Sequence, residues 1–134
     1  MRILRAHGLH GHQLYEVTRA TLVSKLLYAS PAWWGFANTE TRKRFQAVLD
    51  RCCRLGLLPP DFPSFENLVL ELSSTLFNDI EYNSYHVLHQ LMPPLRSTPY
   101  DLRPRSSQRS IPMSNDRMRK TFICWQLLLD SKYI

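Results

Sequence analysis

Five basic residues gather in the run TRKRFQAVLDRCCR, between residues 41 and 54. On a helix they can lie along one solvent-facing side, where guanidinium and ammonium groups hold phosphates. Such contacts give affinity and salt dependence without reading a base sequence. A solvated helix surface is the competing interpretation. The candidate nucleic-acid-binding residues of this run are Arg42, Lys43, Arg44, Arg51 and Arg54.

A second basic stretch covers residues 93–115, which hold five prolines, many serines and four arginines. This composition cannot build a core and predicts an extended linker, which we call the arginine strap. The strap could also lie on phosphates, with Arg103 and Arg105 as the candidate contacts. A linker without any ligand is the competing interpretation.

The residue types and their spacing give little support for metal binding, cofactor binding or catalysis. Two groups of histidines, residues 7–12 and 86–89, lack the Cys or acidic partners that complete a zinc site. The acidic residues are scattered, no C-x-x-C pair occurs, and four glycines do not form a phosphate loop. The sequence therefore predicts no metal, no cofactor, no small-molecule substrate and no enzyme active site.

The cysteines Cys52, Cys53 and Cys124 do not resemble a disulfide framework, because their number is odd and two are adjacent. A reduced intracellular compartment, nuclear or cytoplasmic, is expected. No signal peptide is recognisable after Met1. The uncharged run Leu26–Thr39 is too short to span a bilayer and contains Pro31, so no membrane partner is expected.

The charge is distributed in three blocks, with a total of +6 and a pI near 9.5. Residues 1–60 hold nine basic and three acidic residues, and residues 96–134 hold eight basic and three acidic residues. The middle block, residues 61–95, holds five acidic residues and no Lys or Arg. This layout offers an acidic partner such as nucleic acid two places to bind, while the acidic middle offers a different surface to a protein.

Apolar periodicity predicts helices and no strand. The expected helices cover residues 13–30, 39–55, 65–79, 82–92 and 116–131, with Gly56 ending the second, Ser64 capping the third and Ser73–Ser74 able to divide the third. Pro31 either kinks the first helix or begins a new turn. The predicted fold is all-α, a small irregular bundle of about four to six helices with the strap before the last one. The predicted boundaries are 1–92, 93–115 and 116–134.

Two features are assigned to packing. The second helix should bury Phe45, Val48, Leu49, Cys52 and Leu55, with Cys53 at the border. The adjacent Trp33 and Trp34 of SPAWWGF could stack bases or insert into a membrane. We expect them to pack at a helix junction, with one ring in the core and the other covering a second element, such as the helix of Phe45 and Leu49.

A series of sequence segments indicates a resemblance to one family. ATLVSKLLYASPAWWGF, RFQAVLDRCCRLG, YNSYHVLHQLMPP, YDLRPR and IPM occur in that order and cover nearly the whole chain. Together they resemble the C-terminal part of the reverse transcriptase of non-LTR retrotransposons, especially the jockey-like type. The resemblance implies a helical thumb and its downstream extension, in residues 1–92. In that family the thumb packs on the template–primer duplex, so an RNA–DNA or DNA duplex is the implied partner.

The chain departs from the family in one decisive way, because the adjacent aspartates of the polymerase palm are absent. Those aspartates hold the Mg²⁺ ions of nucleotidyl transfer. The chain is therefore expected to be a fragment without polymerase activity, whose other partner is the missing palm and fingers module. The alternative is a domesticated helical module that binds a protein through its acidic middle segment.

Overall fold

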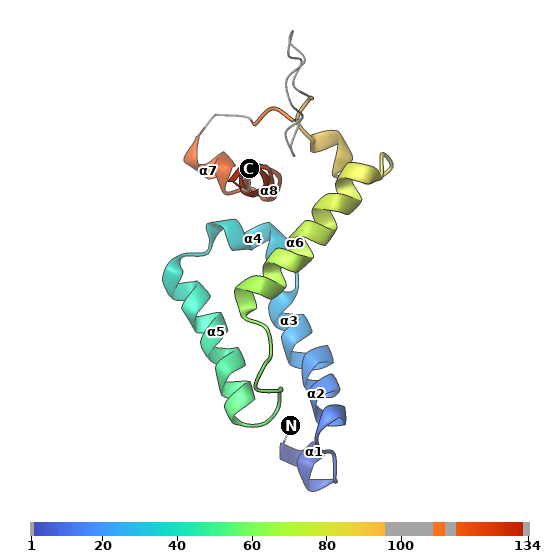
Figure 1. Ribbon diagram of the computed structural model, residues 1–134, viewed down its shortest axis with the longest axis vertical. Helices are drawn as coiled ribbons and strands as arrows, with labels where there is room; N and C mark the ends of the chain where they lie inside the picture. The colour runs from blue at the N-terminus through green and yellow to red at the C-terminus, as the bar shows by residue number, and fades with distance from the viewer. Residues whose placement is uncertain (1, 96–108, 112–114, 133–134) are drawn as a thin grey trace. The chain divides into compact units, whose positions relative to one another are not determined.

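The computed structural model describes residues 2–95, 109–111 and 115–132, and the ribbon in Figure 1 shows helices joined by turns. No strand occurs within these residues, so the prediction of an all-α fold is confirmed. One isolated antiparallel bridge pairs Leu95 with Arg109. The chain forms two compact units, and helix α6 contributes to both. Unit 1 comprises residues 1–30 and 37–70, and unit 2 comprises residues 31–36 and 71–134.

The first predicted helix, residues 13–30, is present as an unbroken helical run over residues 12–27 that contains a π turn and ends earlier than predicted. After α1 (Arg2–Ala6), the chain forms α2 (His12–Thr18), a π-helical turn η1 (Arg19–Val23) and α3 (Ser24–Leu27). The hydroxyls of Thr18, Thr21 and Ser24 each donate to the carbonyl oxygen four residues earlier. Such side-chain bonds compete with the backbone ladder and bend helices, which accounts for the π turn.

Pro31 begins a new turn and does not kink the first helix. This is one of the two alternatives that the sequence left open. Ala29 adopts a φ of 52°, a left-handed conformation that ends the preceding helix. The short helix α4 (Ser30–Trp33) then places Pro31 in its first turn, where the missing N–H costs nothing, and the 3₁₀ turn η2 (Trp34–Phe36) follows.

Helix α5 (Thr39–Arg54) agrees with the prediction for residues 39–55. The side-chain oxygen of Asn38 accepts the backbone N–H of Thr41 at 2.8 Å, which caps the first turn. At the other end, Gly56 has a φ of 61° and donates to Cys53, while Leu57 donates to Cys52. These two bonds form a Schellman motif, so the predicted role of Gly56 is confirmed.

Helix α6 (Phe65–Tyr82) begins as predicted, with the Ser64 hydroxyl accepting the N–H of Asn67 at 3.2 Å. It is not divided at Ser73–Ser74, and it continues to Tyr82 rather than ending near residue 79. Ser73 is fully buried in mid-helix, so this serine lies on the packed face.

The predicted helix over residues 82–92 is wrong. The side chain of Asn83 accepts the N–H of Tyr85 at 3.0 Å, and Nδ1 of His86 accepts the N–H of Leu88 at 3.1 Å. These local bonds divert the backbone from a helical ladder, so the segment consists of turns with one 3₁₀ turn, η3 (His89–Leu91).

The last predicted helix, residues 116–131, consists of two helices, α7 (Asp116–Arg119) and α8 (Phe122–Lys132). Asn115 caps α7 by accepting the N–H of Met118 at 2.9 Å. The hydroxyl and the N–H of Thr121 both bond to the carbonyl oxygen of Met118, which closes a tight turn between the helices.

Each unit has its own buried side chains. Trp34 is 1% exposed and Trp33 is half-buried, with their rings edge-to-face at 5.9 Å between centroids. The burial of Trp34 agrees with a packing role and excludes base stacking by that ring. The apolar core of unit 1 includes Leu14, Val23, Leu49, Cys52, Leu58, Phe65 and Val69, and that of unit 2 includes Trp34, Phe77, Ile80, Cys124 and Leu127.

Candidate nucleic-acid interface

Helix α5 is fixed within unit 1 by contacts near both ends. The rings of Phe45 and Phe65 stack at 4.8 Å with an interplanar angle of 10°. The side-chain oxygen of Gln46 accepts the N–H of Phe65 at 2.8 Å, which joins α5 to the start of α6. At the far end, the Arg5 guanidinium donates to the carbonyl oxygens of Leu55 and Gly56. The orientation of α5 within the unit is therefore determined by side chains on its inner side.

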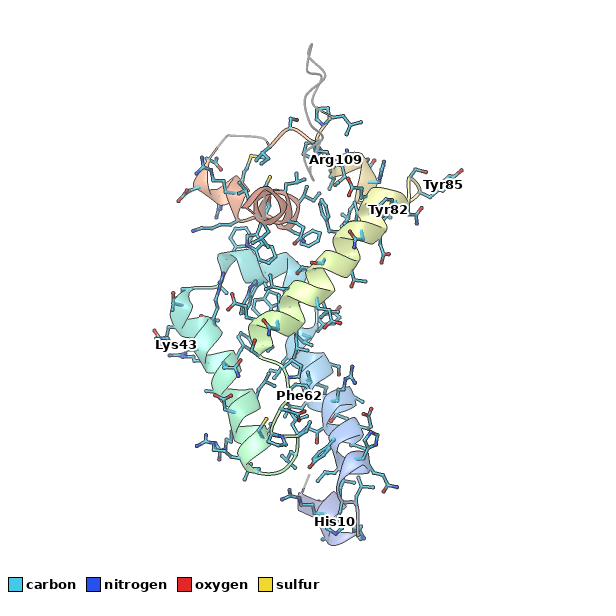
Figure 2. All side chains as sticks on the ribbon, viewed as in Figure 1. His10, Lys43, Phe62, Tyr82, Tyr85 and Arg109 are labelled. Carbon is cyan, nitrogen blue, oxygen red and sulfur yellow. The ribbon has the colours of Figure 1, made fainter. Side chains whose placement is uncertain are left out.

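Four of the five predicted basic residues lie on the opposite side of α5. The helix buries Leu49 and Cys52. At 100° per residue, Lys43, Arg44, Arg51 and Arg54 fall within an arc of about 100°, facing away from these two side chains. All four are exposed, and Figure 2 shows Lys43 on the outer side of α5, away from α2 and α3. We call these four residues the α5 basic face.

Arg42 does not belong to this face, although the sequence analysis grouped it there. Its side chain is half-buried on the inner side of the helix. Its Nε donates to the carbonyl oxygen of Ala37 at 3.2 Å, and its Nη1 lies 3.6 Å from Oε1 of Glu66. Arg42 therefore helps to hold α6 against α5, and its guanidinium is committed to that contact.

Two carboxylates moderate the charge of the face. Glu40 lies in the first turn and accepts a hydrogen bond from Arg44 at 2.6 Å, with both side chains largely exposed. Asp50 lies at the edge of the arc and accepts a hydrogen bond from Gln46 at 2.8 Å. An exposed pair of this kind contributes little to stability, so Arg44 can exchange Glu40 for a phosphate at small cost.

The apolar side of α5 is narrower than predicted. Leu49 and Cys52 are buried and Phe45 is half-buried, as expected. Val48 is 39% exposed and Leu55 is 50% exposed, so their assignment to the buried face is wrong. Viewed down the helix axis, both side chains lie next to Arg44 and Arg51. At 100° per residue they are about 100° to 120° around the helix from the buried Leu49.

The predicted phosphate contacts of the arginine strap, Arg103 and Arg105, lie outside the described residues. Arg109, at the end of the strap, is described and is engaged within unit 2. Its side chain is 15% exposed, its Nε lies 3.5 Å from Oε1 of Glu81, and its Nη1 donates to the carbonyl oxygen of Pro93 at 2.9 Å (labelled in Figure 2). Arg109 therefore binds Pro93 and Glu81 within unit 2, and its guanidinium is not a free cation.

Unit 2 carries a basic cluster that the sequence analysis did not single out. Arg117, Arg119 and Lys120 are all exposed at and just after α7. The signal was present in the run DRMRK, but it was read as the beginning of a longer helix.

The cysteines have the character of packing residues. Burial raises the pKa of the Cys52 thiol, and the neighbouring Cys53 raises it further. Burial also raises the pKa of Cys53, followed by the charge of Asp50. All three cysteines are free, and Cys52 is buried with Cys53 at its border, as predicted. A raised pKa favours the neutral thiol, which is typical of cysteines that serve packing.

Within the described ranges, no three His, Cys, Asp or Glu residues gather closely enough to hold a metal ion. Over that same part of the chain, each helix is too short or too polar to cross a bilayer.

The α5 basic face is thus the best-defined candidate site, with four exposed cations on one helix. Comparison with known proteins adds no relative: the chain matches no family model, no curated protein and no solved structure.

Proposed function

We propose that this chain binds the phosphate backbone of nucleic acid through the α5 basic face, and that it derives from the thumb and downstream extension of a non-LTR retrotransposon reverse transcriptase. The origin rests on the ordered phrases from ATLVSKLLYASPAWWGF to IPM, with which an all-α fold is compatible. The chain itself contributes no polymerase chemistry in this proposal, since it lacks adjacent aspartates.

One observation carries the binding proposal: Lys43, Arg44, Arg51 and Arg54 are exposed together on one side of one helix. Residues 43 and 54 are about 16 Å apart along the axis at 1.5 Å per residue. A single strand of a duplex presents a phosphate every 3.4 Å or so along its axis, so several phosphates fall within reach of the face. No residue of the face is required for the core, which leaves the cations available to a ligand.

The test is a double substitution, Arg44→Ala with Arg51→Ala, measured by fluorescence anisotropy with a labelled RNA–DNA duplex at 50 mM salt. Loss of two phosphate contacts should weaken binding about 30- to 160-fold, at roughly 1–1.5 kcal/mol per contact. Circular dichroism should show unchanged helicity, because both side chains point to solvent and alanine favours helix.

The matched control is Arg19→Ala with Lys25→Ala, which removes the same formal charge from exposed positions of unit 1 outside α5. This control should change the affinity less than threefold. If both double variants weaken binding equally, the interaction follows net charge alone and α5 is not the site.

A second candidate function, binding of a protein through residues 61–95, has one observation in its favour. Large apolar side chains stay exposed at the last residue of α6 and along the turns that follow, with Tyr85 at 95% exposure and projecting outward in Figure 2. Such exposure is typical of interaction surfaces. The acidic character that first suggested this function is reduced, because Glu66 and Glu81 pair with Arg42 and Arg109. The apolar residues are Tyr82, Tyr85, Val87, Leu91 and Leu95.

A further inference from the structure

The α5 basic face is divided into two rows with a small residue between them. Lys43 and Arg54 form one row, and Arg44 and Arg51 form the other, about 80° around the helix at 100° per residue. Ala47 is exposed on the line midway between the rows. Long cationic side chains on both flanks and a methyl group in the centre allow the helix axis to approach a surface closely while the cations reach past it on either side.

We propose that α5 lies in the major groove of B-form DNA, with its two basic rows on the phosphates of opposite strands and Ala47 nearest the base edges. This inference rests on the proposed phosphate-binding function and specifies the ligand of that same site. The midline position of Ala47 makes it the residue that sets the depth of insertion.

Dimensions select this groove among the alternatives. A helix with its side chains is about 10–12 Å across. The major groove of B-DNA is about 12 Å wide, whereas the minor groove is about 6 Å wide. The major groove of A-form duplexes is deep and too narrow for side chains to read, so a helix of this diameter does not enter it. A single strand offers one row of phosphates and leaves the other basic row without a partner.

The border of the face is compatible with this placement. Val48 and Leu55 lie beside the row of Arg44 and Arg51 and remain partly exposed. At 100° per residue they are about 80° to 100° around the helix from Ala47, outside that row, so in this placement they face the sugar–phosphate backbone and not the base edges. Glu40 is the other midline residue, and it lies in the first turn, paired with Arg44, at the end of the inserted helix.

The experiment compares three ligands of equal length and sequence: a DNA duplex, an RNA duplex and the single DNA strand, each titrated with the full chain at the same salt concentration. We expect the DNA duplex to bind about tenfold more tightly than either of the others. Ala47→Leu keeps a strong helix former but adds bulk at the midline, and it should weaken DNA-duplex binding about tenfold. Ala20→Leu, an equal change at an exposed position of unit 1 outside α5, should leave affinity unchanged.

The outcomes separate this inference from the function on which it rests. Equal affinity for the DNA and RNA duplexes, together with an Ala47→Leu variant that binds like the original chain, would overturn the groove placement while leaving phosphate binding intact. Failure of all three ligands to bind at 50 mM salt would overturn both.

Discussion

At the scale of single residues, the structure separates cations that hold the fold from cations that face water. Arg42 and Arg109 direct their guanidiniums to carboxylates and backbone carbonyls within their own units. Lys43 and Arg51 have exposed side chains. The sequence could not make this distinction, because the partners Glu66 and Glu81 are distant along the chain. The basic–acidic–basic charge layout is thus partly satisfied by ion pairs inside the protein.

The cysteine pair leads to a prediction on pH. Burial raises the pKa of the Cys52 thiol in the folded chain above its ordinary value of 9.0. As the pH rises, the unfolded chain therefore loses the Cys52 proton before the folded chain does. The contribution of this thiol to the free energy of unfolding is complete below pH 9.0 and is lost as the pH rises toward the raised pKa. The free energy of unfolding should therefore fall above pH 9. The Cys52 thiol alone contributes up to about 1.4 kcal/mol per pH unit to this fall.

Urea titrations at several pH values from 7 to 10.5 can measure this slope. A Cys52→Ala variant is less stable at every pH because it leaves a cavity, but its curve above pH 9 should be flatter than that of the original chain. Parallel curves for the two proteins would show that the Cys52 thiol does not titrate differently on unfolding.

At the scale of elements, the agreement between prediction and structure depends on how local the signals are. The bounds of helix α5 were predicted within one residue, because the apolar spacing of the helix and Gly56 just after it are local signals. The other helices were predicted less well wherever polar side chains redirect the backbone. Thr18 and Ser24 bond back into the first helix, and Asn83 starts a turn where a helix was expected. Apolar periodicity does not record these bonds.

The candidate site was predictable to a similar extent. The grouping of Lys43, Arg44, Arg51 and Arg54 follows from helical spacing alone. The same spacing places Arg42 about 100° from Lys43, on the side of Leu49, so its exclusion was also predictable. Its partner Glu66 was not, since that contact depends on where α6 starts relative to α5. The partial exposure of Val48 was missed for the same reason, because the direction of the buried side is fixed by tertiary contacts.

The short turn η2 supplies a test of packing between elements of unit 2. A Cβ added to Gly35 would lie 2.2 Å from the carbonyl oxygen of Lys120, in the turn between α7 and α8. Backbone atoms on both sides must then move, so Gly35→Ala should destabilise the protein by about 3 kcal/mol. Chemical denaturation measures the loss.

Gly8→Ala is the matched comparison. Gly8 has a φ of 87° but no atom within 4 Å of the added Cβ, so the substitution costs only backbone strain, about 1 kcal/mol. A Gly35→Ala protein as stable as the Gly8→Ala protein would mean that η2 and the Lys120 carbonyl do not meet in solution.

At the scale of the whole molecule, we propose that the net positive charge serves a polyanion and that α5 is where this charge acts. Among the described cations outside this face, Arg42 and Arg109 are committed to the fold, and Arg117, Arg119 and Lys120 form a separate cluster. Arg19 and Lys25 are exposed in unit 1 and serve as the control positions. The binding of a polyanion releases counterions in proportion to the phosphates contacted, so the number of contacts can be counted by varying the salt.

The most direct measurement is the affinity for a DNA duplex between 50 and 200 mM salt. Four contacts predict a slope of about −3 to −4 in a plot of log K against log salt, which is about a 100-fold loss across this range. The Arg44→Ala, Arg51→Ala variant should reduce the slope by about two. A slope near zero, or the same slope in the original chain and the variant, would contradict the assignment of α5 as the phosphate-binding element.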